Sequence, residues 1–294
     1  MLNRRQFTQR LAATAASLAA ADRLSAKPRD AHPFRLSVML WTLRPKYTAE
    51  QAIELVAGAG YNGFELVDED KRWSAADVAR VRARMAKLGI VCDAISGIHA
   101  GFADPDGGER LADELPPRMD QAERLGCRRI ILLSGKRVPG MSRDAQHAIC
   151  VQNLKRAGEL AAKRSFELLL EPIDALENPP IYLTRVAEAF AIARAVNLPS
   201  VSVLYDFYHE QQGLPAGAPG LADLLAPLRG NMDLLGLVHI ADVPGRHAPG
   251  TGTIDFAVIY RELRKQGYRG WLAMEFLPLG DAASELRKAA AEIS

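Results

Sequence analysis

The stretch RLGCRRIILL, residues 124–133, contains the end of a helix, a glycine and an apolar strand, and it sets the pattern for the chain. Gly126 stands where the helical period stops, and a glycine ends a helix at little cost because it adopts the left-handed conformation. The run 128–133 that follows has the length of a strand. The same joint recurs in three stretches: AGAGYNGFE (57–65), KLGIVCD (87–93) and KQGYRGW (265–271). One helix-to-strand connection is therefore used repeatedly.

Apolar runs of strand length alternate with stretches of helical period. The predicted strands are 35–40, 62–67, 90–95, 128–133, 166–171, 200–206, 235–240 and 271–276. The predicted helices are 48–59, 75–88, 114–125, 143–164, 182–196, 219–229, 255–266 and 281–293. Short apolar strands separated by amphipathic helices require a parallel sheet covered by helices, and eight such units favour an α/β fold of the (β/α)8 TIM-barrel type. An open doubly wound sheet is the alternative, but no glycine-rich nucleotide loop follows the first strand.

Composition narrows the class of protein. The 294 residues are 48% hydrophobic and 24% charged, which is enough apolar material for one barrel-sized domain. The formal net charge is +2 and the basic residues are spread along the chain, which argues against a nucleic-acid partner. The three cysteines, Cys92, Cys127 and Cys150, are far apart and form no C-x-x-C pair, so neither a zinc knuckle nor a disulfide framework is indicated.

Residues 1–26 differ from the rest of the chain. NRRQFTQ (3–9) places paired arginines before an alanine-rich stretch, and small residues follow at Ser25 and Ala26. This pattern resembles a twin-arginine export signal, and it predicts a single mature domain, 27–294, in the periplasm. The alternative is a basic amphipathic helix that stays attached, in which case the protein is cytoplasmic. The stretch is too short and too weakly apolar for a membrane span, so no stable membrane insertion is expected.

Four polar residues end successive strands in the second half of the chain. LLLEP ends on Glu171, VLYDF on Asp206, GLVHI near His239 and LAMEF near Glu275. In a barrel the carboxyl ends of the strands meet at one face, so these side chains are expected at one level of its mouth. Packed this closely they would repel one another and be poorly solvated, and a divalent cation removes both costs. For any one of them alone, a strand-end polar residue capped by a loop is the competing interpretation.

The predicted ligand set bears on the metal. Three carboxylates and one imidazole, with no thiolate, suit Mn²⁺ or Mg²⁺ and also admit Co²⁺ or Zn²⁺. Four protein ligands in an octahedral shell leave two positions open for neighbouring substrate oxygens. Manganese is the favoured ion.

Several of these stretches resemble a known family. LLLEPID (168–174), LYDFYHEQ (204–211), GLVHIADVPGRHAPGTGTIDF (236–256) and GYRGWLAMEFLP (267–278) resemble the xylose-isomerase-like TIM-barrel superfamily of sugar isomerases and epimerases. Within it, the resemblance is strongest to the hydroxypyruvate isomerases. The segment 239–256 is long and unusual, which makes the resemblance specific, whereas the N-terminal half adds little precision.

The resemblance implies roles for individual residues. Glu171, Asp206, His239 and Glu275 would be the metal ligands, and Glu171 and Glu275 would also be the proton-transfer pair. His209 and Arg246 would contact the substrate, and Glu177 matches an acidic position that touches substrate in the epimerases. Hydroxypyruvate isomerases commonly have glutamine where His239 stands, whereas the keto-sugar epimerases have histidine. The chain thus shares features with both groups.

The same residues suit one kind of chemistry. Moving a proton between adjacent carbons of a hydroxy-carbonyl compound requires stabilisation of the developing enediolate. A metal that holds the carbonyl and hydroxyl oxygens does this as a Lewis acid, while one carboxylate takes the proton and another returns it. The predicted enzyme is an intramolecular isomerase of a small hydroxy-carbonyl compound, such as hydroxypyruvate, which it converts to tartronate semialdehyde. A keto-sugar epimerase is the alternative.

Two residues outside the ligand set have roles that the sequence also suggests. His209 lies just beyond the end of its strand and could donate a hydrogen bond to the oxyanion; a loop histidine bonded to the backbone is the alternative. Arg246 lies in a loop rich in Pro and Gly, and its planar fork of donors suits an anionic or polyhydroxy substrate. An ordinary solvated arginine is the alternative there.

Other readings come from different classes of protein. An abasic-site endonuclease of the same superfamily would need further histidines after the third and fourth strands, where the chain has AISGIHAG and LLSGKRVPG, so nuclease activity is not expected. A barrel that binds a sugar or a metal without turnover is disfavoured because both glutamates of the proton-transfer pair are present. Members of the superfamily often pair, so a homodimer is compatible with the resemblance.

Three further residues are lesser candidates. Glu65 ends the second strand and could reach the pocket, but an ion pair with a nearby base such as Lys71 is the alternative. Trp41 and His99 follow the first and third strands and could wall the site. Core or rim packing is the favoured role for both.

Overall fold

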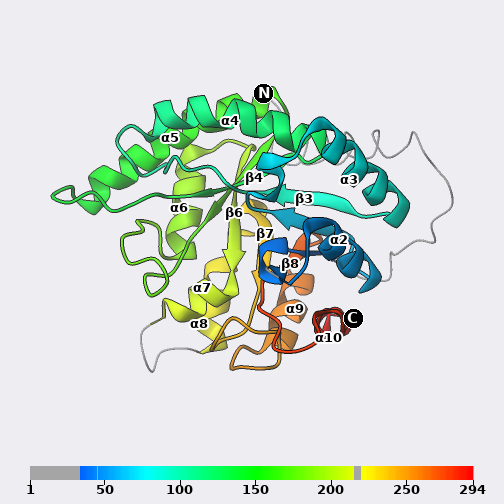
Figure 1. The fold of residues 1–294 in the computed structure, drawn as a ribbon. Coiled ribbons are helices and arrows are strands. Elements are labelled where there is room, and N and C mark those ends of the chain that lie inside the picture. Colours follow the sequence, from blue (N-terminus) through cyan, green and yellow to red (C-terminus); the bar gives the residue numbers. More distant parts are fainter. Residues whose placement is uncertain (1–33, 45, 215–219, 294) are drawn as a thin grey trace.

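The parallel strands lie side by side in chain order and close into a barrel (Figure 1). The structure is a computed structural model that describes residues 34–44, 46–214 and 220–293. The strands are β1 Arg35–Val38, β2 Gly63–Leu66, β3 Val91–Ile95, β4 Arg129–Leu133, β5 Glu167–Glu171, β6 Val201–Asp206, β7 Leu235–Ile240 and β8 Trp271–Met274. The helices are α2 Ala49–Gly58, α3 Ala75–Leu88, α4 Gly107–Arg124, α5 Arg143–Lys163, α6 Val186–Val196, α7 Phe207–Gln212, α8 Leu221–Leu225, α9 Phe256–Lys265 and α10 Ala282–Glu292. The export signal predicted for 1–26 lies outside the described residues.

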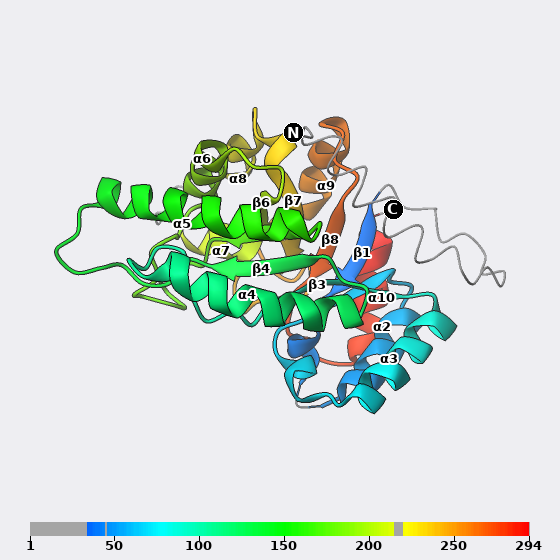
Figure 2. The same ribbon diagram turned by 90° about the horizontal axis from the view of Figure 1, so that it is seen from above.

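The sheet is almost fully closed. Its order is β1-β8-β7-β6-β5-β4-β3-β2, with every pair parallel, and β1 meets β2 through the parallel bridge between Met39 and Glu65. The helices surround the strands, and α4 and α5 run beside each other in both views (Figures 1 and 2). The predicted (β/α)8 TIM barrel is therefore confirmed, and the open sheet is excluded.

The helix-to-strand joints have the expected backbone. Gly60, Gly89, Gly126 and Gly267 all have positive φ, from 63° at Gly89 to 96° at Gly60. In α3, for example, the helix begins at the capping residue Ser74 and ends at Gly89, whose left-handed conformation turns the chain toward β3.

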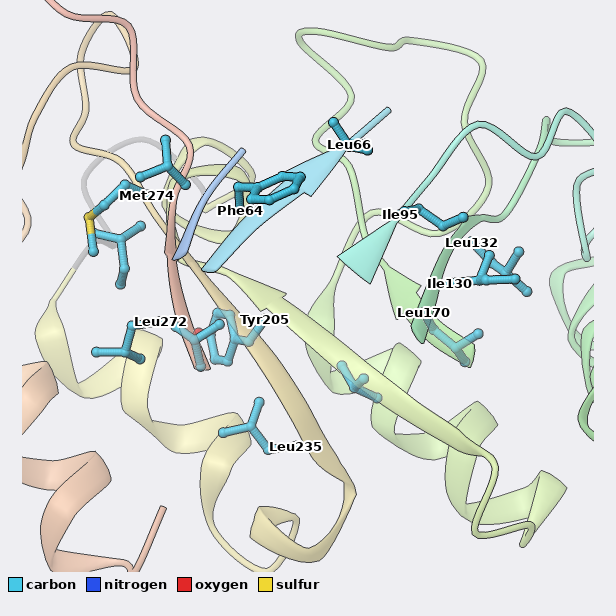
Figure 3. Close-up of a cluster of buried hydrophobic side chains, with 14 of the residues drawn as sticks. Phe64, Leu66, Ile95, Ile130, Leu132, Leu170, Tyr205, Leu235, Leu272 and Met274 are labelled. Atoms are coloured by element: carbon cyan, nitrogen blue, oxygen red, sulfur yellow. The ribbon is translucent and has the colours of Figure 1, made fainter. Parts of the chain in front are cut away.

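Side chains along the strands alternate between two apolar clusters. The larger cluster includes helix residues and therefore lies between the barrel wall and the helices (Figure 3). Its strand members include Ile130 and Leu132 on β4 and Leu170 on β5. The smaller cluster comes from the strands and their ends, so it fills the barrel lumen: Met39, Ala94, Ile131, Leu169, Leu204, Leu237, Trp271 and Ala273. Because successive strand residues face opposite sides, this alternation identifies which positions point into the lumen.

Several helix boundaries differ from the predicted ones. Helix α4 begins at Gly107 rather than at 114, and Gly107 and Gly108 allow close packing at its start. A Cβ at Gly107 would lie 2.2 Å from the carbonyl oxygen of Gly101. The helix predicted at 219–229 is divided into α8 and a 3₁₀ turn, Ala226–Leu228, that contains Pro227.

The short helix α7 was not predicted. It starts directly after β6, where the side chain of Asp206 accepts a hydrogen bond from Tyr208 N. The residue interpreted only as a ligand is thus also a helix cap.

Candidate functional site

The four predicted ligands all point into the lumen above its apolar layer. Leu169, Leu204, Leu237 and Ala273 belong to the lumen cluster, and each predicted ligand follows its neighbour in that layer by two positions. Glu171, Asp206, His239 and Glu275 are consequently on the inward face of adjacent strand ends. All four are buried, with exposed fractions of 7%, 3%, 0% and 6%.

The ligand atoms of these four residues converge. One ligand atom from each lies within 4.8 Å of the others. The Nδ1 atom of His239 lies 2.6 Å from Glu275 Oε2 and 3.6 Å from Glu171 Oε1. The donor set fits a hard or borderline divalent cation, since it offers carboxylate oxygens and one imidazole nitrogen and no sulfur.

Burial and neighbouring charges separate the pKa values of the two glutamates. Burial raises the pKa of Glu171 above its ordinary value, and the nearby Glu275 charge adds to that rise. Burial also acts to raise the pKa of Glu275, but the positive charges of Arg246 and His239 outweigh it, so the pKa of Glu275 is lowered. Two carboxyl groups with pKa values moved in opposite directions are the usual basis for distinct acid and base roles.

Arg246 lies over the cluster and is buried. Its Nη2 atom lies 2.8 Å from Glu275 Oε2 and 3.3 Å from Asp206 Oδ2, and its Nε donates to the Glu275 carbonyl at 3.1 Å. Its Nη1 is 3.1 Å from Glu177 Oε2. The exposed, solvated arginine considered from the sequence is therefore not what the structure shows.

The loop that carries Arg246 is organised by Asp242. Arg246 itself has φ of 58°, a left-handed conformation that is uncommon outside glycine. The fully buried carboxylate of Asp242 accepts four backbone N–H groups, from Val243 and Ile254 at one oxygen and from Gly250 and Gly252 at the other. These bonds hold both ends of the loop on one side chain.

His209 is a buried member of the pocket wall. Its Nδ1 lies 2.7 Å from Asp174 Oδ2, and its Nε2 lies 3.5 Å from Asp206 Oδ2. Burial lowers the pKa of His209, but Asp206 and Asp174 outweigh that effect and raise it to about 9. The imidazole is therefore a cation at neutral pH, and the loop histidine bonded to the backbone is not observed.

Asp174, Glu177 and His209 form a second group with metal-ligand spacing. Arg246 Nη1 lies 3.1 Å from Glu177 and 3.3 Å from His209 Nε2. Since a guanidinium already contacts this group, we assign it to the wall that faces a substrate.

The candidate site opens into a cavity of about 320 Å³. The wall contains Met39, Val67, Ser96, Leu133, Glu171, Ile173, Glu177, Asn178, His209, Arg246 and Glu275. The cavity thus brings together both glutamates of the proton-transfer pair and the three residues predicted to contact substrate.

Two residues have a larger part in the site than the sequence suggested. Glu65 Oε2 lies 2.9 Å from His239 Nε2. The alternative considered from the sequence, an ion pair between Glu65 and Lys71, is therefore wrong. Trp41 Nε1 donates to Glu275 Oε1 at 2.7 Å, so Trp41 contacts the cluster directly rather than only packing at the rim. Both follow the strand-end rule that identified the four ligands, and the same rule could have found them.

His99 does not join the site. It is exposed, and its Nε2 lies 3.3 Å from Lys71 Nζ. Among the described residues, neither group with metal-ligand spacing includes a residue from the ends of β3 or β4, as a further endonuclease metal would require. In the same part of the chain, no helix is long and apolar enough to cross a membrane.

Comparisons with known proteins agree with the fold. A family model described as xylose isomerase-like TIM barrel matches residues 53–292. The putative hydroxypyruvate isomerase of Homo sapiens is 30% identical over 274 residues, which cover 86% of this chain and 93% of that protein. The hydroxypyruvate isomerase of Escherichia coli strain K12 is 30% identical over 183 residues, covering 62% and 68%. A crystal structure of an AP endonuclease, family 2, from Brucella melitensis superposes with a TM-score of 0.73 at 23% identity, covering 88% and 98%, which shows a common fold. The chain therefore belongs to the xylose isomerase-like TIM barrel family.

Proposed function

We propose that the protein is a metal-dependent intramolecular isomerase that converts hydroxypyruvate to tartronate semialdehyde. The observation that carries this proposal is the buried cluster of Glu171, Asp206, His239 and Glu275 beneath the guanidinium of Arg246. Named isomerases among the relatives support the reaction class.

The four residues of the cluster would hold Mn²⁺ or Mg²⁺, with Co²⁺ or Zn²⁺ also compatible with the donors. When bound, such an ion would act as a Lewis acid on the carbonyl and hydroxyl oxygens of the substrate. The residues on this chain then have to orient the substrate, shield it from water and move one proton.

The two glutamates would divide the proton transfer. Glu275, whose pKa is lowered, would take a proton from the hydroxymethyl carbon of hydroxypyruvate, which leaves an enediolate. Glu171, whose pKa is raised, would deliver a proton to the neighbouring carbon, and the hydroxyl proton would pass to the former carbonyl oxygen. The product is an aldehyde with the same atoms.

Two cationic side chains in the pocket wall, which also holds the carboxylates of Glu171, Glu177 and Glu275, could bind an anionic substrate. Arg246 and the protonated His209 present two cations at the cavity wall, and either can bind a carboxylate through a charge-assisted hydrogen bond. A cavity of about 320 Å³ suits a compact substrate. Both features favour a small 2-oxo acid.

One observation favours a second candidate, a keto-sugar epimerase. The cluster contains a histidine, His239, at a position where the keto-sugar epimerases have histidine. The hydroxypyruvate isomerases usually have glutamine there. An epimerase would use the same pair of glutamates on opposite faces of one carbon. A barrel that binds a sugar or metal without turnover is the third possibility and predicts no proton exchange.

Proton NMR in D₂O with Mn²⁺ and a panel of hydroxypyruvate and ketoses tests the proposal. We expect solvent deuterium at the carbon next to the carbonyl of hydroxypyruvate, and a loss of about 10²- to 10⁴-fold in rate for Glu275→Gln. Glu262→Gln, a carboxylate on α9 that pairs with Gln266 and Lys265, is the control. Exchange with a ketose alone, with its epimer as the product, would identify an epimerase, and no exchange with any compound would favour the binding protein.

We also propose that residues 1–26 direct export of the folded protein, so that it works in the periplasm. Fusion of 1–33 to a reporter tests this directly. Export that stops when Arg4 and Arg5 are both replaced by lysine would support the proposal, and a cytoplasmic reporter would contradict it.

A further inference from the structure

A network of buried polar side chains runs through the lumen behind His239. Glu65 Oε2 lies 2.9 Å from His239 Nε2, and Ser37 Oγ lies 3.3 Å from Glu65 Oε1. Ser37 Oγ also lies 3.1 Å from Asp93 Oδ2, and Asp93 forms an ion pair with Arg129. Glu65 and Ser37 are fully buried, and Asp93 is 5% exposed. Carboxylates are rarely buried without a specific partner, so the burial of Glu65 and Asp93 in this network requires an explanation.

The two ring nitrogens of His239 face different groups. Nδ1 faces the ligand cluster, 2.6 Å from Glu275 Oε2, whereas Nε2 faces away from it toward Glu65. A neutral imidazole has one lone pair and one N–H, and the partner of one nitrogen decides which nitrogen keeps the proton. An acceptor at Nε2 holds the proton there, so the proton released when a metal binds is the one on Nδ1, and the lone pair that this frees is directed at the cluster.

The other members of this network hold the acceptor, Glu65, in place. Glu65 comes from β2 and His239 from β7, so their contact crosses the lumen. Ser37 has a single hydroxyl hydrogen between the carboxyl groups of Glu65 and Asp93. The guanidinium of Arg129 compensates the charge of Asp93, and Arg129 in turn lies over the ring of Trp271, which belongs to the apolar lumen layer. Glu65 therefore has a defined orientation before any ligand arrives.

We propose that Glu65 is a positioning residue for the metal centre, whose accepting oxygen keeps the proton of His239 on Nε2 so that Nδ1 is free to bind the ion. This role rests on the metal site of the proposed function. Partners of metal-bound histidines of this kind typically change metal affinity 10- to 100-fold when they are removed.

Two substitutions separate the accepting oxygen from packing. In Glu65→Gln the amide oxygen can still accept from His239 Nε2, and the amide nitrogen can donate to Ser37 Oγ, whose hydrogen then serves Asp93. In Glu65→Leu the lumen stays filled but the acceptor is lost. Asp70→Leu is the matched control. Asp70 is a buried carboxylate that follows the same strand, β2, and forms an ion pair with Arg118. It does not belong to the ligand cluster.

The measurements are the Kd for Mn²⁺ by calorimetry and ¹⁵N NMR of ring-labelled histidine in the Zn²⁺-loaded protein. We expect wild type and Glu65→Gln to agree within about threefold in Kd, with a proton on Nε2 of the zinc-bound ring. Glu65→Leu should bind Mn²⁺ at least 10-fold more weakly and should lose that single ring signature. Asp70→Leu should lower the melting temperature without changing the Kd.

Four results would overturn the role. An unchanged Kd in Glu65→Leu would show that the acceptor is dispensable, and equal losses in Glu65→Leu and Glu65→Gln would show that an accepting oxygen is not what matters. Equal losses in Glu65→Leu and Asp70→Leu would show a general effect of stability. A wild-type protein that binds no Mn²⁺ would refute the metal site itself and with it this role, which distinguishes failure of the proposed function from failure of the inference.

Discussion

Replacement of Asp242 by asparagine should loosen the loop that holds Arg246. The two carboxylate oxygens of Asp242 accept four backbone N–H groups at 2.9–3.0 Å, two at each oxygen. Asparagine retains one accepting oxygen, and its amide nitrogen must face two N–H donors. Whichever way the amide turns, two hydrogen bonds are lost and donors meet donors.

The size of the effect follows from those two bonds. Gly250 and Gly252 are exposed, so water can satisfy part of what their N–H groups lose. At about 1 kcal/mol for each lost bond, Asp242→Asn should lower the free energy of unfolding by about 2 kcal/mol. Activity should fall further than stability suggests, because the displaced loop moves Arg246 away from Glu275 and Asp206.

Urea unfolding and the isomerase assay together measure both effects. Asp255→Asn is a suitable control, because Asp255 lies just beyond the same loop and only caps α9 through Val258 N. We expect a smaller loss of stability there and unchanged kcat/KM. If Asp242→Asn unfolds at the same urea concentration as wild type and keeps its kcat/KM, the carboxylate does not organise the loop.

Three further changes have defined outcomes. Gly252→Ala should lower kcat/KM at least 10-fold, because a Cβ at that position would lie 2.1 Å from the Val243 carbonyl oxygen; wild-type kinetics would contradict the close approach. The pKa of His209 is raised to about 9 when folded, so its contribution to stability is complete below its unfolded pKa, about 6.5, and is lost as pH rises through about 9. The free energy of unfolding of the metal-free protein should therefore decline over that range. His209→Gln should reduce this slope in urea titrations at several pH values without abolishing it, because the charges of Glu65 and Glu275 also raise the pKa of the buried His239. A slope identical to that of wild type would refute the contribution of His209. Mn²⁺ at 100 times its Kd should stabilise the protein by about 2.7 kcal/mol, and EDTA should reverse this stabilisation. The affinity for Mn²⁺ should rise with pH because His239 must release its Nδ1 proton. A melting temperature that does not change with Mn²⁺ at any pH would contradict the metal site.

The fold was predictable because each connection carries its own local signal. The glycines at 60, 89, 126 and 267 end helices through conformations that other residues adopt at a cost, so the joints can be read from single positions. Helix beginnings were less certain. Gly107 and Gly108 have low helix propensity, yet they lie inside α4, where Asn153 and the backbone of Gly101 approach too closely for a side chain.

The site was predictable in part, since strand alternation carries information about which residues share the lumen. The period of two that buries Leu169 also turns Glu171 inward, and the same holds for Leu204 and Asp206. The partner of Glu65 could not be found in this way. Its contact with His239 depends on the closure of the barrel, which brings β2 opposite β7, and local pattern does not specify that distance.

The arrangement around Glu275 suggests how metal and substrate would share one arginine. Glu275 Oε2 is contacted both by His239 Nδ1 at 2.6 Å and by Arg246 Nη2 at 2.8 Å, so two positively charged groups stabilise the oxygen that faces the cluster. A divalent ion would compete with both donors for that oxygen. The proton on Nδ1 would have to leave, whereas Arg246 would retain Glu177 and the Glu275 carbonyl as partners and could direct one N–H pair toward the cavity. Metal affinity and substrate binding are therefore expected to be coupled through Arg246. The loop that Asp242 organises would hold Arg246 in the position that this coupling requires.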